Sequence, residues 1–284
     1  MKQEKIIRSV NWHVTMSCNY NCRFCFYKNT KGEVIDLEKV GNKLRKLRSI
    51  GIDKINFTGG EPLLCKELGS LLKIAKSEGF IVSIVTNGSL LNEINISEMA
   101  ETVDWIGISV DSADERVEKE LGRGYGNHVK NVKHVSKLIN EYGIKLKINT
   151  TVTKSNYNEK LTDLIESLAP ERWKVFQFLL LKGQNDEALN LSITTEEFEN
   201  FKKINGHLIL KNGTKPIFES NDDMLDSYLI IGPDGNIILS QNYERSVIPF
   251  ESIDSIDLSE IVNFEKYLKR GAIYNWQGGK DHKN

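Results

Sequence analysis

The chain has 284 residues, of which 39% are hydrophobic and 27% charged, and its formal net charge is −1 at pH 7. This composition is typical of a globular protein with a sizeable core, and the balanced charge argues against a general nucleic-acid binder or a basic membrane-surface protein. The longest apolar runs, such as "FQFLLL" at 176–181, are too short to span a bilayer, and the first ten residues lack the apolar segment of a signal peptide. We therefore expect a cytoplasmic protein whose thiols stay reduced.

Short strands rich in Val and Ile alternate with amphipathic helices along the first two thirds of the chain. Strands are predicted over residues 9–16, 54–58, 81–86, 104–110, 146–152 and 173–181. The first helix is predicted to begin after an N-cap at Asp36 and to end near Gly51. Six such units predict a parallel sheet with right-handed crossovers, and six are fewer than the eight of a closed barrel. We therefore expect an α/β fold in which residues 1–183 form a partial (β/α)6 barrel.

The remaining residues, 184–284, contain a different pattern. A helix is predicted within 195–204, a hairpin over 227–240 with a Pro-Asp-Gly turn, and a final helix near 259–270. The sequence contains no internal repeat, low-complexity tract or long linker. We therefore expect this part to be an α/β extension that covers the barrel and belongs to the same structural unit.

Three cysteines follow the first predicted strand with the spacing C-x3-C-x2-C: Cys18, Cys22 and Cys25. They fall at the C-terminal end of the strand, where α/β barrels build their functional sites. Thiolates are good ligands for iron–sulfur clusters, and three thiolates on a four-iron cluster leave one iron open to a small molecule. A structural zinc site that uses a histidine such as His13 as the fourth ligand remains the alternative.

The residues around these cysteines fit the cluster interpretation. Tyr20, Phe24 and Phe26 are aromatic and can limit the access of water to a cluster. The fourth cysteine of the chain, Cys65, stands alone at the start of a predicted helix, and we interpret it as a small apolar filler.

Further polar segments end or follow the later strands. In "TGGEP" at 58–62, Gly59 and Gly60 allow a close backbone approach to a ligand, and Glu61 supplies a carboxylate. "TNGS" at 86–89, "SVDS" at 109–112 and "GRGYGNH" at 122–128 occupy comparable places. Each of these segments could by itself be an ordinary turn.

The cysteine loop with an aromatic residue before its last cysteine, followed one strand later by "TGGEP", resembles the radical S-adenosylmethionine enzymes. This resemblance implies a partial (β/α)6 barrel, a [4Fe-4S] cluster on the three cysteines, and S-adenosylmethionine on the open iron, where reductive cleavage gives a 5′-deoxyadenosyl radical. By the same resemblance, the residues expected around the cofactors are Tyr20, Phe24, Gly59, Gly60, Glu61, Asn87, Ser109 and Arg123.

Several strands carry polar side chains at every second position, whereas strands of a parallel sheet are normally apolar on both faces. The cations in these rows are Lys54, Lys147, Arg172 and Lys174. Buried cations require a partner, so we expect these four to face a ligand, and we expect Lys145 to lie at a strand end in water. A small polyanion, best a phosphate chain, is the substrate that this pattern predicts.

A narrower resemblance is carried by "VNWHVTMSCNYNCRFCFY" at 10–27, "KINFTGGEP" at 54–62 and "RWKVFQFLL" at 172–180, and it extends over residues 8–276. These segments look like the viperin family of antiviral enzymes. The resemblance implies that CTP, UTP or GTP is converted to its 3′-deoxy-3′,4′-didehydro form by abstraction of the 4′ hydrogen and loss of the 3′ hydroxyl. It places Lys147, Arg172 and Lys174 at the triphosphate, with Asn11, Lys54, Asn56 and Asn149 near the ribose or base. Tyr228 in "DSY" would be catalytic, as a late proton or hydrogen donor.

The resemblance also implies an electron donor of the flavodoxin or ferredoxin type, and we expect a monomer with no nucleic-acid or membrane partner. The chain departs from the animal members in "FYKNTK" at 26–31, in "GPDGNIILSQNYERS" at 232–246 and in "QGGKDHKN" at 277–284. The first two differences could change the accepted base.

Two rival functions remain. One is a radical enzyme that acts on a peptide or on another phosphorylated small molecule. The absence of any cysteine after Cys65 argues against a peptide-modifying enzyme. The other is a non-catalytic nucleotide-binding or zinc-stabilised module.

Overall fold

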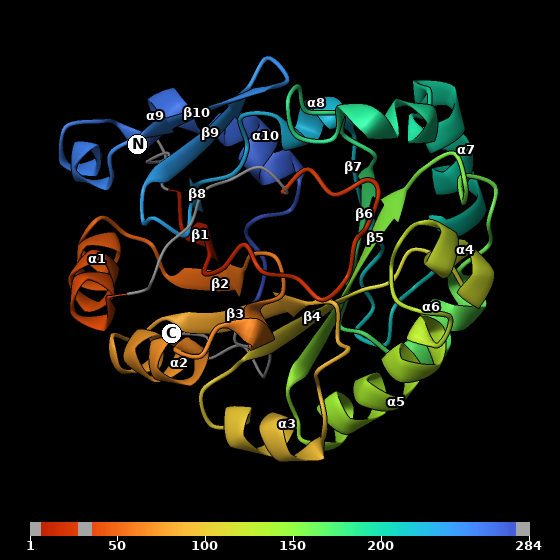
Figure 1. The fold of residues 1–284 in the computed structure, drawn as a ribbon, viewed down its shortest axis with the longest axis horizontal. Helices are drawn as coiled ribbons and strands as arrows, with labels where there is room; N and C mark the ends of the chain where they lie inside the picture. The colour runs from red at the N-terminus through yellow and green to blue at the C-terminus, as the bar shows by residue number, and fades with distance from the viewer. Residues whose placement is uncertain (1–6, 28–35, 277–284) are drawn as a thin grey trace.

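Within residues 7–27 and 36–276, which the computed structural model describes, ten strands form one curled sheet (Figure 1). Its centre consists of six parallel strands in sequence order, which confirms the six predicted units. They are β1 (Ser9–His13), β2 (Lys54–Thr58), β3 (Ile81–Thr86), β4 (Trp105–Ser109), β5 (Lys145–Val152) and β6 (Arg172–Gln177).

Helices cover the outer face of these strands (Figure 1). Asp36 caps the first of them as expected, because its side chain accepts hydrogen bonds from the backbone N–H groups of Glu38 and Lys39. The apolar side chains of the helices and of the outward strand faces form the main core, in which Leu44, Leu47 and Phe57 are fully buried. The helices are α1 (Leu37–Ser49), α2 (Leu68–Ser77), α3 (Glu93–Met99), α4 (Glu115–Glu120), α5 (His128–Glu141) and α6 (Thr162–Leu168), with a short 3-10 turn at Pro62–Leu64. Of the helices that the structure describes, none is long and apolar enough to cross a lipid bilayer.

The C-terminal third lengthens the sheet at both edges. β7 (Ile217–Glu219) pairs with β6, whereas β8 (Ile230–Ile231) pairs with β1, and both pairings are parallel. The predicted hairpin is formed by β8 and β9 (Ile237–Gln241), and β10 (Glu244–Ile248) adds a further antiparallel strand. Figure 1 shows α8 and α10 beside the opening that remains between β7 and β8. The helical segments of this part are Asp186–Leu191, α7 (Thr195–Asn205), α8 (Asn221–Met224), Phe250–Asp254, α9 (Leu258–Ile261) and α10 (Phe264–Lys269).

Three predicted elements differ from the structure: two strands are shorter than predicted, and one helix is divided into two. The strand predicted over 173–181 ends at Gln177, because its neighbour β5 ends at Val152 and the last ladder bond is Phe178 N–H to Val152 C=O. The helix predicted over 259–270 is broken between α9 and α10. Its break lies at Asn263, whose side chain accepts a hydrogen bond from Lys266 N–H and begins a new helix. The strand predicted over 9–16 likewise ends at His13.

The segment that follows α10 crosses the N-terminal end of the barrel and forms its floor. Trp276 C=O accepts hydrogen bonds from Trp105 Nε1 and Lys145 Nζ, both at 2.8 Å. Tyr274 accepts a hydrogen bond from Lys54 Nζ at 2.5 Å. Lys145 lies at the first residue of β5 and is partly exposed, as expected, but the C-terminal segment also supplies a partner for its ammonium group.

The cysteine loop is held from two sides by backbone that only glycine can provide. Gly60 N–H donates to Thr15 C=O at 2.8 Å, and a Cβ atom on Gly60 would lie 2.2 Å from the Ser17 carbonyl oxygen. On the other side, a Cβ atom on Gly122 would lie 2.1 Å from Asn21 C=O. Glycine at 60 was expected to admit a ligand, but the group that approaches it most closely is the backbone of the cysteine loop itself.

Gly60→Ala should displace the cysteine loop. We expect it to lower the free energy of unfolding by about 1–3 kcal/mol, the usual cost of overpacking, and to reduce the iron bound per chain after anaerobic reconstitution. Gly69→Ala is the matched control, because a Cβ atom there meets no heavy atom within 4 Å. It should retain its iron and change stability by no more than about 1 kcal/mol. Equal iron in both variants would show that the loop tolerates the displacement.

Candidate active site

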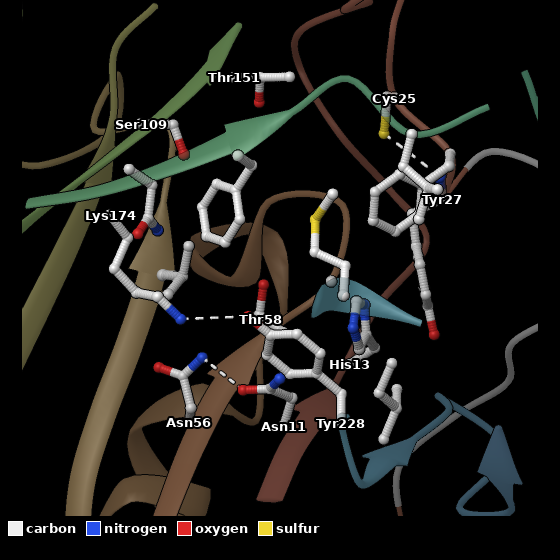
Figure 2. A pocket seen from close by; sticks show the side chains of 18 of the residues that line it. Asn11, His13, Cys25, Tyr27, Asn56, Thr58, Ser109, Thr151, Lys174 and Tyr228 are labelled. Carbon is white, nitrogen blue, oxygen red and sulfur yellow. Dashed lines mark hydrogen bonds between the residues drawn. The ribbon is translucent and has the colours of Figure 1, made fainter. Parts of the chain in front are cut away.

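A cavity of about 670 Å³ fills the barrel between the cysteine loop, the inner strand faces and the C-terminal part of the chain (Figure 2). It brings together residues from both ends of the sequence. All predicted site residues except Glu61 line it, namely Cys18, Cys22, Cys25, Tyr20, Phe24, Gly59, Gly60, Asn87, Ser109, Arg123, Asn11, Lys54, Asn56, Lys147, Asn149, Arg172, Lys174 and Tyr228.

The three loop cysteines all line this cavity. Backbone N–H groups point at two of their sulfurs, from Tyr20 to Cys18 Sγ and from Tyr27 to Cys25 Sγ, each at 3.4 Å. Such donors suit thiolate ligands, whose negative charge they stabilise.

The geometry does not support the alternative zinc site with His13 as the fourth ligand. In the part of the chain that the structure describes, no three His, Cys, Asp or Glu side chains are grouped so that they could hold a metal ion. A zinc ion needs its ligands about 2.0–2.3 Å away on one centre, whereas the ligands of a four-iron cluster bind different irons. His13, the alternative zinc ligand, instead stacks on Tyr27 with ring centroids 3.6 Å apart, and burial holds its pKa well below the usual range.

Glu61 lies behind the cavity wall rather than in it. Its carboxylate is fully buried and accepts hydrogen bonds from Thr86 Oγ1 at 2.7 Å, from Asn87 N–H at 2.8 Å and from Leu63 N–H at 3.1 Å. The role predicted for Glu61 at a ligand does not match this placement, because its oxygens are already engaged. The carboxylate instead fixes the turn that presents Asn87 to the cavity.

Arg123 reaches the cavity with its charge already balanced. Its Nε donates to Asp111 Oδ2 at 2.5 Å, and Glu118 lies 3.7 Å away. Glu118 accepts backbone hydrogen bonds from Asp111 and Ser112, and burial together with the Asp111 charge raises its pKa to about 8. The guanidinium also lies 5.2 Å from the Phe24 ring, so this network ties the cysteine loop to the loop after β4.

His128 joins the same two segments. Its Nε2 donates to Ser109 C=O at 2.8 Å, and its Nδ1 lies 3.3 Å from the Tyr20 hydroxyl. Burial lowers the pKa of His128 to about 3, so the ring is neutral and Nδ1 is free to accept the Tyr20 hydrogen.

The four cations predicted from the strand pattern line the other end of the cavity, and three of them have partners. Lys54 lies among aromatic rings, 4.8 Å from the centroid of Trp105 and 4.7 Å from that of Tyr274. Arg172 donates to Gly271 C=O and stacks on Tyr274 at 3.8 Å. Lys174 forms an ion pair with Glu219.

Lys147 differs from these three. Its ammonium group makes no hydrogen bond or ion pair with any other residue that the structure describes, although the side chain is largely buried. Burial, followed by the charges of Lys174 and Arg172, lowers the pKa of Lys147 to about 7, and burial also lowers that of Lys174 to about 7. An anion bound in the cavity would stabilise the charged form of Lys147 and so oppose both effects on its pKa.

Two buried amide oxygens in the cavity wall also have no hydrogen-bond partner within residues 7–27 and 36–276. They belong to Asn56 and Asn149, while the Asn56 amide nitrogen donates to Asn11 Oδ1 at 2.9 Å. Figure 2 shows Asn11 and Asn56 side by side. These groups lie on β1, β2 and β5 and are available to the hydroxyl groups of a sugar.

The sequence analysis missed several residues of the site. Glu219, Arg270 and Tyr274 come from the C-terminal part, and no role was predicted for any of them. The only signal for such residues was that the predicted strands carry several cations for which the strand pattern offers no acidic partner. The predicted departures at residues 28–31 and 277–284 lie outside the described residues.

Cys65 behaves as the sequence analysis predicted. It packs against the main core, and burial raises the pKa of its thiol to about 11. It is not among the residues that line the cavity.

Known structures are similar to this fold at low sequence identity. Streptococcus suis SuiB bound to S-adenosylmethionine matches with a TM-score of 0.69 and 18% identity, over 87% of this chain and 64% of that chain. At this identity the likeness shows the fold alone.

Sequence comparison identifies the family. The Radical SAM superfamily profile matches residues 12–168. An S-adenosylmethionine-dependent nucleotide dehydratase of the Thermoplasmatales archaeon strain ISO4-H5 is 37% identical over 95% of this chain and 96% of that protein. The S-adenosylmethionine-dependent nucleotide dehydratase RSAD2 of Danio rerio is 35% identical over 94% of this chain and 78% of that protein. With its cysteine loop and cationic cavity, the chain therefore belongs to the radical S-adenosylmethionine superfamily and, within it, to the nucleotide dehydratases of the viperin family.

Proposed function

We propose that the protein converts CTP, UTP or GTP to the 3′-deoxy-3′,4′-didehydro analogue, which lacks a 3′ hydroxyl and so terminates viral RNA synthesis. The observation that carries this proposal is the unpaired, buried Lys147 beside Arg172 and Lys174 in the cavity wall. Three cations on neighbouring strands suit a chain of phosphates better than a single carboxylate or a neutral peptide.

The family brings two cofactors, a [4Fe-4S] cluster and S-adenosylmethionine. Cys18, Cys22 and Cys25 would hold the cluster, and the cavity-lining groups beside them would surround S-adenosylmethionine, namely Tyr20, Phe24, Gly59, Gly60, Asn87, Ser109 and Arg123. When bound, these cofactors supply a 5′-deoxyadenosyl radical that takes the 4′ hydrogen of the ribose. The single electrons come from a donor of the flavodoxin or ferredoxin type.

The protein's own residues bind and orient the nucleotide. Lys147, Arg172 and Lys174 hold the triphosphate. Asn11, Lys54, Asn56 and Asn149 lie near the ribose or base, where the unpaired oxygens of Asn56 and Asn149 accept hydrogen bonds from hydroxyl groups. Holding both ends of the nucleotide places its 4′ hydrogen between the cluster end and the cationic end of the cavity.

Tyr228 supplies the proton that the dehydration needs. The C3′–O bond breaks, one proton joins the leaving oxygen to give water, and one electron completes the C3′=C4′ double bond. Tyr228 lines the cavity, and burial, with the Glu219 charge, raises the pKa of its phenol well above the usual range. The phenol therefore keeps its hydrogen until the leaving oxygen takes it.

The function is tested by incubating reduced, iron-loaded protein with S-adenosylmethionine and each nucleoside triphosphate in turn. We expect at least one triphosphate to stimulate 5′-deoxyadenosine formation and to yield a nucleotide that is lighter by one water, as seen by mass spectrometry. Stimulation by none of the four would refute the proposed function.

Lys147→Met should weaken triphosphate binding while the cluster stays intact. Loss of a charged hydrogen bond costs about 1.5–3 kcal/mol, so we expect the Kd to rise about 10- to 100-fold in a titration of the iron-loaded protein. Lys145→Met is the matched control, since Lys145 lies on the same strand but not in the cavity wall. Similar losses in both variants would contradict the role of Lys147.

Triphosphate binding should weaken as the pH rises above about 7. The pKa values of Lys147 and Lys174 are about 7 in the free protein, and a bound phosphate raises them because it stabilises the ammonium forms. Binding above pH 7 must then take up protons, so the Kd increases from pH 7 to pH 9. Lys147→Met should give a shallower slope in the same titration, and an equal slope would exclude Lys147 as the titrating group.

A further inference from the structure

We propose that Glu219 is a positioning residue for the dehydration step: it holds the Tyr228 phenol at the cavity wall and balances the charge of Lys174. This inference rests on the proposed function and extends it to a residue that touches neither cofactor nor nucleotide. Glu219 is fully buried and is not among the cavity-lining residues.

The contact between Glu219 and Tyr228 joins the two edges of the open barrel. Glu219 ends β7, which pairs with β6, whereas Tyr228 lies just before β8, which pairs with β1. The phenol donates a hydrogen bond to Glu219 Oε2 at 2.5 Å across this opening. The position of Tyr228 relative to β6 and its cations therefore depends on this carboxylate.

Two cations, Lys174 and Arg270, also contact the Tyr228 side chain. Lys174 Nζ donates to the Tyr228 oxygen at 3.1 Å, a bond that Figure 2 shows, and it also pairs with Glu219. The Arg270 guanidinium lies 3.7 Å from the Tyr228 ring centroid and is itself anchored on Ser227 C=O at 2.9 Å. The phenol is thus held through its hydrogen, its oxygen and its ring face.

A purely structural role explains Glu219 poorly. A buried ion pair contributes little to stability compared with apolar side chains of similar volume. Glu219 also engages Lys174, one of the three cations that the triphosphate needs. A buried carboxylate at position 219 is explained if its function is to hold the Tyr228 phenol in one position during the reaction.

The chemistry of the step fits this arrangement. When the C3′–O bond breaks, the phenol turns its hydrogen from Glu219 to the leaving oxygen, the Tyr228 proton passes to that oxygen and gives water, and the flavodoxin- or ferredoxin-type donor supplies the electron that completes the C3′=C4′ bond. Lys174, already hydrogen-bonded to the phenol oxygen, stabilises the phenolate and continues to neutralise Glu219. Glu219 exchanges no atom with the nucleotide.

The test measures two products in one reaction, the didehydro nucleotide and 5′-deoxyadenosine. Tyr228 and Glu219 act after the 4′ hydrogen has been removed, so Glu219→Gln should leave 5′-deoxyadenosine formation largely intact and lower the nucleotide formed per 5′-deoxyadenosine by about tenfold or more. Tyr228→Phe should lower the same ratio, and the double variant should be no worse than Tyr228→Phe alone. The KM for the triphosphate should not rise, because Glu219→Gln frees Lys174.

Asp223→Asn is the matched control. Asp223 is a buried carboxylate four residues after Glu219, and it pairs with Lys269 and Ser220 outside the cavity wall. The Asp223→Asn variant should therefore form the same amount of nucleotide per 5′-deoxyadenosine as the wild type. Where Glu219→Gln fails to fold, Glu219→Asp retains the charge but withdraws it from the phenol, and the same fall is expected.

Three outcomes would overturn the inference. They are an unchanged ratio in Glu219→Gln, a parallel loss of both products, or a double variant in which the two losses multiply. A wild-type protein that turns over no triphosphate would instead refute the proposed function, and the inference with it.

Discussion

The barrel interior concentrates four cations where a parallel sheet would ordinarily bury apolar side chains, and the need to balance them organises the rest of the molecule. The C-terminal segment supplies partners for two of them. Lys54 donates a hydrogen bond to the Tyr274 hydroxyl, and Arg172 donates to Gly271 C=O and stacks on the Tyr274 ring. Lys174 is met by Glu219 from the strand added at one edge. Lys147 alone of the four has no partner among the described residues, and that deficit points to an anionic substrate.

The other end of the cavity follows a different constraint. Three sulfurs must be presented on a short loop, and the loop is fixed by backbone contacts at Gly60 and Gly122 that leave no room for a side chain. Buried networks centred on Glu61 and Arg123 then fix the turns around it. Backbone contacts and hydrogen bonds therefore hold the cofactor end of the cavity in place. At the substrate end, positively charged side chains prepare the cavity for an anion.

Much of this arrangement could be predicted from the sequence, because it depends on periodic or local signals. Strand and helix alternation predicted the six units, and cations at every second strand position predicted the lining of the cavity by Lys54, Lys147, Arg172 and Lys174. Contacts made by single residues over long distances could not be predicted. Glu219 stands on a three-residue strand with no pattern, and the apolar run after Gln177 gave no sign that its partner strand ends at Val152. Glu61 matched a motif, but only the fold shows that its carboxylate faces a turn.

The two ends of the cavity act on one nucleotide only if the ribose lies between them. The most direct measurement uses a triphosphate carrying deuterium at the 4′ position, incubated with the reduced, iron-loaded protein and S-adenosylmethionine, with both products analysed by mass spectrometry. Our interpretation predicts one deuterium in 5′-deoxyadenosine and none in a nucleotide that has lost its 3′ hydroxyl. Deuterium retained in the nucleotide, with 5′-deoxyadenosine unlabelled, would contradict it.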